Sequence, residues 1–254
     1  MSHTDRPLEI VYRDDDLVAI NKPAGLLVHK SPIDRHETRF AIQLLRDQIG
    51  QRVYPLHRLD KPTSGVLLFA LSPGIAAQVS SHWHTEVHKT YVAIVRGLAP
   101  DTAEIDHPIS YQADDYVKRP EKQPAAQPAR TQILRLANIE LPNAVDKYPS
   151  SRYSLVQCKP LTGRRHQIRR HLKHISHPII GDAKHGKGKH NRFFAENLQA
   201  PGLLLSAVQF TLPHPVSGAV LIINAPLRGS MAYIINRFDW HQAIHPQWLD
   251  TYAP

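Results

Sequence analysis

The sequence predicts an α+β fold with a mixed, mostly antiparallel sheet. Short apolar runs typical of strands recur along the chain, and helical patterns interrupt them without strict β-α-β alternation. Neither a Walker A pattern nor a Rossmann glycine pattern occurs. A parallel sheet that binds a nucleotide cofactor is therefore not favoured.

The first half of the chain supplies clear strand and helix signals. Arg13 and three aspartates separate two apolar runs, as expected of a strand, an acidic turn and a strand. Gly50 marks the end of a helical pattern, and Ser72-Pro73 is a typical helix start. The predicted elements are strands at 8–12 and 17–21, a loop at 21–29, a helix at 39–49, a buried strand at 66–71, a helix after Ser72 and a strand at 90–95.

The second half begins with a segment that predicts an exposed loop, because it holds three prolines and little apolar surface. A later helix is expected to end before Pro178. The predicted elements are the loop at 117–130, strands at 130–138 and 153–160, a loop and helix within 161–178, a strand pair at 203–212 and 219–226, and a helix at 230–243.

Charge and cysteine content narrow the function. The chain has 31 basic and 22 acidic residues and a net charge of +9, which favours nucleic acid as a partner and anionic membrane second. The single cysteine, Cys158, excludes an intramolecular disulfide and favours a reducing compartment. No signal peptide or membrane-spanning run is recognisable. We expect a soluble, cytoplasmic protein.

A strongly basic helix is predicted at 164–174, where Ile168, Leu172 and Ile175 form one apolar stripe. Two arginines at its start oppose the helix dipole, which prefers anions there. A solvated cationic face is one interpretation. A phosphate bound at Thr162-Gly163 is the other, and it favours an RNA role. The polar residues of this helix are Arg164, Arg165, His166, Arg169, Arg170, His171, Lys173 and His174.

The histidines do not predict a metal site. Residues 82–88 and the histidines of 166–177 lack both an HExxH pattern and a companion thiolate cluster. Surface histidine is the commoner explanation, and we expect no metal. Cys158 lies in a strand-like run, where a buried cysteine is ordinary rather than nucleophilic.

Asp60 in "HRLDKPTSG" has two interpretations. Before Lys61-Pro62 it would form a turn, and the local sequence favours this. Alternatively it is a carboxylate that nearby cations keep ionised and that attacks an electrophilic carbon. Arg58 and the basic helix are the available cations.

Longer motifs are informative here. The segment 57–70, "HRLDKPTSGVLLFA", resembles the signature of pseudouridine synthases of the large-subunit ribosomal type, the RluA family. Four further segments match motifs of that family in the same order, and "LLLSA" (203–207) and "HP" (214–215) extend the match. The four are "NKPAGLLVH" (21–29), "KTYVAIVRG" (89–97), "LTGRRHQIRRHL" (161–172) and "HPIIGDAKHG" (177–186).

The resemblance implies a fold, an activity and residue roles. The fold would be one catalytic domain, residues 1–254 with a core at 8–228, whose central sheet with flanking helices is split by a catalytic cleft. The activity would be isomerisation of uridine to pseudouridine in RNA, without cofactor or metal. Asp60 would be the nucleophile, Tyr91 would stack on the flipped base, and Arg169 would pair with Asp60. The RNA-binding residues would be Arg58, Lys89, Arg164, Arg165, His166 and Arg170, with Arg58 holding the base-flipped form.

Two mechanisms are compatible with an aspartate here. The carboxylate can attack the ribose anomeric carbon, as in retaining glycosidases, or promote proton abstraction to a glycal. Two departures from the wider family leave this set untouched: His185 stands where the family usually has tyrosine, and Ser206 where it usually has histidine. About 20 residues precede the first motif, too few for an added S4 RNA-binding domain.

The variants at 177–192 and 28–37 resemble a branch of the family that acts on uridine 65 in the T-stem region of tRNA. An enzyme for ribosomal RNA, or for both RNAs, is the alternative within the class. A non-catalytic RNA-binding module is the alternative outside it. We expect a monomer that needs no obligate protein partner and no membrane.

Overall fold

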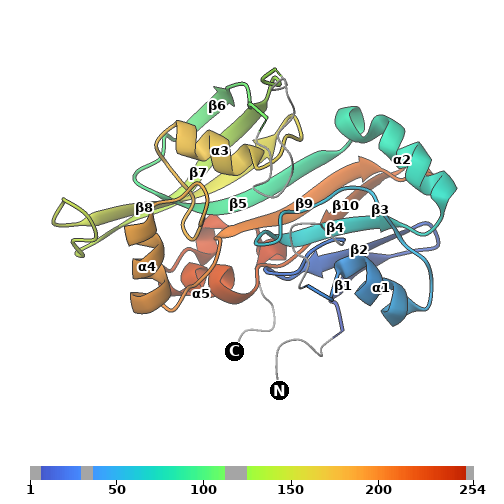
Figure 1. The fold of residues 1–254 in the computed structure, drawn as a ribbon, viewed down its shortest axis with the longest axis horizontal. Helices are drawn as coiled ribbons and strands as arrows, with labels where there is room; N and C mark the ends of the chain where they lie inside the picture. The colour runs from blue at the N-terminus through green and yellow to red at the C-terminus, as the bar shows by residue number, and fades with distance from the viewer. Residues whose placement is uncertain (1–6, 30–36, 112–124, 250–254) are drawn as a thin grey trace. The chain divides into compact units, whose positions relative to one another are not determined.

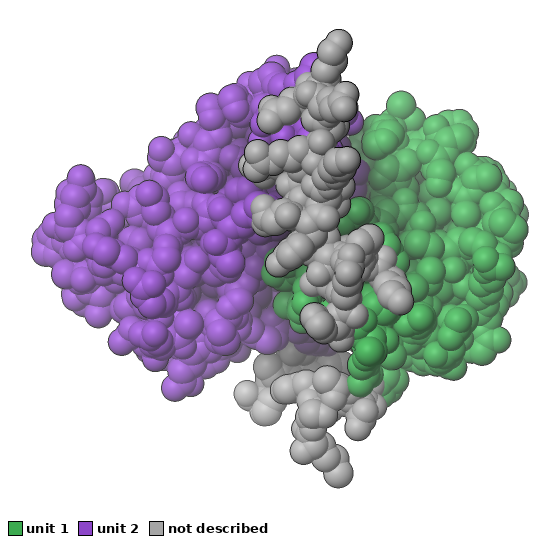
Figure 2. Space-filling model, viewed as in Figure 1, with its two compact units in different colours: residues 1–88, 209–225 green, residues 89–208, 226–254 purple. Residues whose placement is uncertain are grey.

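The computed structural model describes residues 7–29, 37–111 and 125–249 and divides the chain into two compact units. Unit 1 comprises residues 1–88 and 209–225, and unit 2 comprises residues 89–208 and 226–254 (Figure 2). The predicted loop at 117–130 lies outside the described residues up to position 124. In its remainder, Gln127 pairs with Ile109 through a bridge, Ala129 accepts a hydrogen bond from the His107 N–H, and Arg130 is the first residue of a strand.

The strands of unit 1 pair antiparallel. β2 pairs with both β1 and β4, β3 pairs with β4, and β10 pairs with β9. All six residues of β2 and six of the seven in β4 are buried, so side chains cover both faces of these strands. The strands are β1 (Ile10–Arg13), β2 (Leu17–Lys22), β3 (Tyr54–Pro55), β4 (Ser64–Ala70), β9 (Leu205–Pro213, which starts in unit 2) and β10 (Val220–Asn224).

Two helices of unit 1 confirm their predicted ends. Helix α1 (Ala41–Ile49) stops at Gly50, whose φ of 68° is left-handed and suits glycine. Helix α2 (Pro73–Glu86) starts after Ser72, whose hydroxyl accepts a hydrogen bond from the backbone N–H of Ile75. Both ends were predicted because a helix cap depends on only a few neighbouring residues.

Unit 2 contains four antiparallel strands in the order β5-β8-β7-β6. They are β5 (His88–Arg96), β6 (Thr102–Asp106), β7 (Arg130–Leu141) and β8 (Ser151–Pro160). β6 was not predicted, since it is short and polar and only Ile105 is fully buried.

Helix α3 begins later than predicted. It spans Gln167–His174, so Arg164 and Arg165 precede it rather than forming its first turn. His166 has a left-handed φ of 53°, which is incompatible with a continuing helix. The side-chain oxygen of Gln167 accepts hydrogen bonds from the Thr162 hydroxyl and the Arg164 N–H, which fixes this start.

The other helices of unit 2 are α4 (Gly188–Asn197), α5 (Gly229–Arg237) and two 3₁₀ turns, η1 (His241–Ala243) and η2 (Pro246–Trp248). The predicted helix at 230–243 is therefore too long. Asp239 adopts a left-handed φ of 54° and ends the α-helical run. Helix α4 was not predicted.

Helices cover both faces of the unit 2 sheet (Figure 1). On one face, Ile168 and Leu172 of α3 pack in a cluster with Cys158. On the other, Phe194 of α4 and residues of α5 pack around Tyr153. The mostly antiparallel pairing and the five α-helices of the described residues confirm the predicted α+β class.

Candidate active site

Asp60 lies in unit 1, half-buried, in the loop between β3 and β4. Its carbonyl oxygen accepts a hydrogen bond from the Thr63 N–H at 3.0 Å, which closes a turn just before β4. Both interpretations of the motif therefore keep their basis. The backbone of Asp60 takes part in the turn.

The residues before Asp60 are anchored by His57. Its Nε2 accepts a hydrogen bond from the Leu68 N–H at 3.0 Å. Its ring stacks on Trp83, with centroids 5.1 Å apart, and lies 4.7 Å from Phe210. The first residue of the "HRLD" motif is thus structural, and it fixes the path of the chain into Asp60.

Lys22 is a site residue that the sequence reasoning missed. Its side chain is 0% exposed, although lysine is rarely buried. The ammonium donates hydrogen bonds to the carbonyls of Pro23 and Leu26 at 2.8 Å and of Lys61 at 3.2 Å. It therefore joins the loop after β2 to the turn that follows Asp60.

The charge of Lys22 is coupled to Asp60. Burial lowers the pKa of Lys22 to about 7, and the negative charge of Asp60 opposes that shift. A cation that loses its proton near neutral pH thus lies within electrostatic reach of the candidate nucleophile. The available signal was a lysine at the end of an apolar strand, directly before Pro-Ala-Gly.

Arg58 is exposed, as a contact to RNA phosphates requires. Burial and the nearby charge of Arg58 lower the pKa of His29, so the loop at 21–29 lies close to this arginine. Unit 1 thus brings together Asp60, Arg58 and the first family motif.

Arg169 of unit 2 forms a buried ion pair with Asp182. Its Nε and Nη2 each donate to one carboxylate oxygen at 2.8 Å. The two side chains are 6% and 0% exposed. The predicted pairing of Arg169 with Asp60 stays a prediction.

Asp182 is held rigidly in turn. Its Oδ1 also accepts the backbone N–H groups of Lys184 at 3.0 Å and His185 at 2.9 Å. Burial would raise the pKa of Asp182, but the hydrogen bonds and charge of Arg169 and the His185 N–H outweigh it, so the pKa is lowered. The carboxylate therefore stays ionised. The "HPIIGD" segment was recognised as a motif, but no role was predicted for Asp182.

Tyr91 and Lys89 lie on β5 in unit 2. Tyr91 is half-buried, pairs in register with Cys158 on β8, and packs against the cluster that includes Ile168 of α3. Tyr91 and the helix of Arg169 therefore share one packed region. Burial lowers the pKa of Lys89. Cys158 is buried and its pKa is raised by burial, which agrees with a packing role.

The remaining predicted RNA-binding residues differ in their surroundings. The Arg164 Nε donates to the Pro128 carbonyl at 3.2 Å, and Arg170 donates to the carbonyl and hydroxyl oxygens of Ser110 at 2.8 and 3.0 Å. His166 Nδ1 lies 3.0 Å from His185 Nε2. Arg165 is exposed. Arg164 and Arg170 thus have structural contacts beside any contact with RNA.

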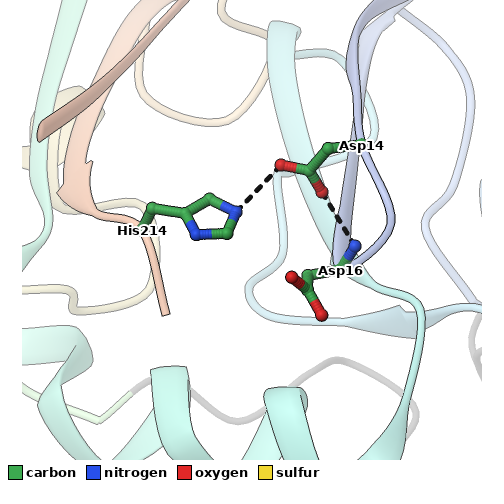
Figure 3. A group of neighbouring side chains, drawn as sticks. All are labelled: Asp14, Asp16 and His214. Carbon is green, nitrogen blue, oxygen red and sulfur yellow. Dashed lines mark hydrogen bonds and ion pairs between the residues drawn. The ribbon is translucent and has the colours of Figure 1, made fainter. Parts of the chain in front are cut away.

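One group of three potential metal-binding side chains occurs among the described residues: Asp14, Asp16 and His214 (Figure 3). Asp14 accepts four hydrogen bonds, from the Tyr12 hydroxyl, the Asp16 and Leu17 N–H groups and His214 Nε2. His214 Nδ1 accepts from two backbone N–H groups, so its Nε2 carries the hydrogen. These four hydrogen bonds give Asp14 a structural role at this turn.

A comparison with protein-family models defines the class of enzyme. The model of the RNA pseudouridylate synthase family matches residues 16–174. The chain belongs to this family.

Relatives resemble the chain over nearly its full length. It is 48% identical to tRNA pseudouridine synthase C of Vibrio vulnificus over 235 residues, which cover 92% of this chain and 96% of the relative. It is 48% identical to tRNA pseudouridine synthase C of Vibrio cholerae over 239 residues, which cover 93% and 98%. The Pasteurella multocida protein of the same name is also 48% identical, over 92% and 97% of the two chains.

Solved structures confirm the fold. Human RNA pseudouridylate synthase domain containing 4 matches with a TM-score of 0.67 and 27% identity, over 91% of this chain and 93% of that one. Domain containing 1 matches with a TM-score of 0.66 and 24% identity, over 87% and 83%. Among the described residues, no helix is long and apolar enough to cross a membrane.

Proposed function

We propose that this protein converts uridine to pseudouridine in tRNA, at uridine 65 in the T-stem region, with Asp60 as the nucleophile. The observation that carries the proposal is the 48% identity, over more than nine-tenths of both chains, to relatives named tRNA pseudouridine synthase C. Two observations support the chemistry. The buried Lys22 ammonium lies within electrostatic reach of Asp60, and two hydrogen bonds to Asp182 fix the position of Arg169. We propose that residues 1–254 form one cytoplasmic catalytic domain. The family match draws on both units.

The roles follow from the chemistry of the bond that must break. The Asp60 carboxylate attacks C1′ of the ribose while the C1′–N1 bond breaks and uracil leaves as an anion. The base turns, its C5 bonds to C1′ and expels the carboxylate, and the C5 proton is lost to solvent while N1 gains a proton. In the glycal route, the carboxylate instead removes a proton from C2′. Deuterium at C2′ slows turnover only in that second route.

Tyr91 and Arg169 support either route. The Tyr91 ring stacks on the extruded base, which replaces part of the stacking energy lost on flipping. Arg169 pairs with Asp60 and orients its carboxylate for the reaction. Arg58, Lys89 and Arg165 hold phosphates near the flipped nucleotide.

The test compares Asp60→Asn with a matched control, Asp47→Asn, which changes an exposed aspartate on α1. Release of tritium from C5-labelled uridine in tRNA measures turnover. We expect no release by Asp60→Asn with unchanged tRNA binding, and wild-type release by the control. Full turnover by Asp60→Asn would refute the nucleophile. Mapping pseudouridines in tRNA and ribosomal RNA from cells with and without the gene tests the substrate, and loss confined to ribosomal RNA would refute uridine 65.

A further inference from the structure

Four basic side chains surround the start of helix α4 in unit 2. Between Asp182 and Glu196 the chain carries Lys184, Lys187, Lys189 and Arg192 and no acidic residue. All four are exposed, whereas His185, His190 and Phe194 of the same segment are buried. The segment thus directs its cations outward and its ring side chains inward. We call these four residues the α4 basic face.

Three of the four cations lie at the start of α4. Lys187 is the residue before the first helical turn, and Lys189 and Arg192 are three positions apart on the helix, where side chains are neighbours. Burial and the charges of Arg96, Lys187 and Lys189 lower the pKa of His190 beneath them. His190 accepts a hydrogen bond from the Arg96 Nε at 3.1 Å and lies 2.9 Å from the Tyr153 hydroxyl. A neutral histidine therefore lies buried next to these exposed cations.

The turn between β7 and β8 contacts this face through Asp146. Asp146 of the turn pairs with Lys189 at 2.9 Å, and both side chains are exposed, so the pair is weak. Next to it, Lys147 Nζ lies 5.0 Å from the ring centre of Tyr148, which is 56% exposed. Exposed cations beside an exposed aromatic ring are typical of surfaces that bind RNA.

One residue of the α4 basic face is hydrogen-bonded to the partner of Arg169. Lys184 donates its backbone N–H to the same Asp182 oxygen that binds Arg169. Charge complementarity selects the occupant, because RNA presents a phosphate on every nucleotide.

We propose that the α4 basic face binds the phosphate backbone of the substrate RNA on nucleotides outside the reacting uridine. The assignment rests on the proposed function for the identity of that RNA. It makes the face a contributor to substrate affinity and not to the chemical step.

The experiment compares two variants that each remove four positive charges. One is Lys184→Gln, Lys187→Gln, Lys189→Gln and Arg192→Gln. The control is Arg13→Gln, Arg46→Gln, Arg52→Gln and Arg237→Gln, which changes exposed arginines elsewhere. Binding of full-length tRNA is measured over a range of salt concentrations. Thermal unfolding checks both folds, and Lys187→Gln with Lys189→Gln serves as a milder second variant.

We expect the Kd of the α4 variant for tRNA to rise about tenfold or more, with unchanged kcat at saturating tRNA. The slope of log K against log salt should fall by about 0.7 to 0.9 for each phosphate that the variant no longer binds. The control should keep both values. An α4 variant that matches the control would overturn the proposal. So would a variant that loses only binding to phosphatidylserine vesicles. Absence of pseudouridine formation by the wild type would instead refute the proposed function, while the salt comparison would still test the surface.

Discussion

Asp182 holds the Nε–Nη2 edge of Arg169 through two hydrogen bonds of 2.8 Å, in a pair almost fully removed from solvent. Breaking a buried pair leaves an uncompensated charge. We predict that Asp182→Asn lowers the free energy of unfolding by about 3 kcal/mol or more. It should also lower kcat per folded molecule by about 10- to 100-fold, since a misplaced guanidinium cannot orient the reacting groups. Denaturant unfolding and single-turnover kinetics measure the two effects.

A purely structural Asp182 would give a different result. The variant would then unfold more easily but keep wild-type kcat at temperatures where it is folded. Arg169→Lys is the companion change, because it keeps the charge but cannot bind two carboxylates edge-on. We expect it to reproduce the loss of kcat.

Lys22 predicts a pH dependence. Because its pKa in the folded protein is about 7, the cation near Asp60 disappears as the pH rises through neutrality. We predict an inflection near pH 7 in the profile of kcat/KM that is absent in Lys22→Met. That profile measured on both proteins is the check, and an unchanged inflection in Lys22→Met would assign it to another group.

The same lysine affects stability with a defined sign. The folded pKa of about 7 lies below the ordinary lysine value of about 10.4, so the unfolded chain binds more protons between these two pH values. The contribution of Lys22 to stability therefore rises with pH across this window and is least favourable below pH 7. Urea unfolding of the wild type and Lys22→Met between pH 6 and 10 measures the difference. If the stability of the wild type relative to Lys22→Met fell as the pH rose, the assignment of a buried cation to Lys22 would be wrong.

His185 predicts sensitivity to acid. Burial lowers its pKa to about 4, whereas an unfolded histidine titrates near 6.5. The unfolded state binds more protons between these values, so stability falls as the pH drops from about 6.5 to 4, by roughly 3 kcal/mol for this residue. His185→Tyr, the residue usual in the wider family, should flatten this part of the curve. Unfolding midpoints of the wild type and of His185→Tyr are measured from pH 4 to 7. An equal pH dependence in the two proteins would show that His185 is not responsible.

Gly181 predicts a steric requirement. Its φ is +78°, and an added Cβ would lie 1.6 Å from the carbonyl oxygen of Gly202. Gly218 is the matched control, because its φ is +70° but an added Cβ would meet nothing within 4 Å. We expect Gly218→Ala to cost about 1–2 kcal/mol and Gly181→Ala at least twice that. Equal costs in denaturant titrations would show that the backbone near Gly202 yields.

Features that depend on a few neighbouring residues were predictable from the sequence. Gly50 and Ser72 were correctly identified as helix ends because their caps need only local residues. The start of α3 was not, since His166 is left-handed and the Gln167 side chain reaches back to Arg164. Helix α4 has no capping signal, and it forms around His190 and Phe194, which bury themselves against Tyr153.

The site shows the same division. Asp60, Tyr91 and Arg169 were identified by resemblance to a family, and their roles stay predictions. Lys22 was missed because its burial depends on carbonyls from two segments, one of them 39 positions away at Lys61. Asp182 was missed because nothing near it in sequence marks Arg169, 13 positions earlier, as its partner.

The route of the chain through the two units has a consequence for synthesis on the ribosome. Residues 209–225 belong to unit 1, although residues 89–208 of unit 2 precede them in the sequence. These residues supply Phe210, which packs on His57, and His214, which bonds to Asp14. Unit 1, which contains Asp60, thus cannot complete its packing until about residue 225 has been translated. If translation stops earlier, the sheet of unit 1 is incomplete and exposed. We therefore expect the nascent chain to depend on chaperones until it can fold into the active enzyme.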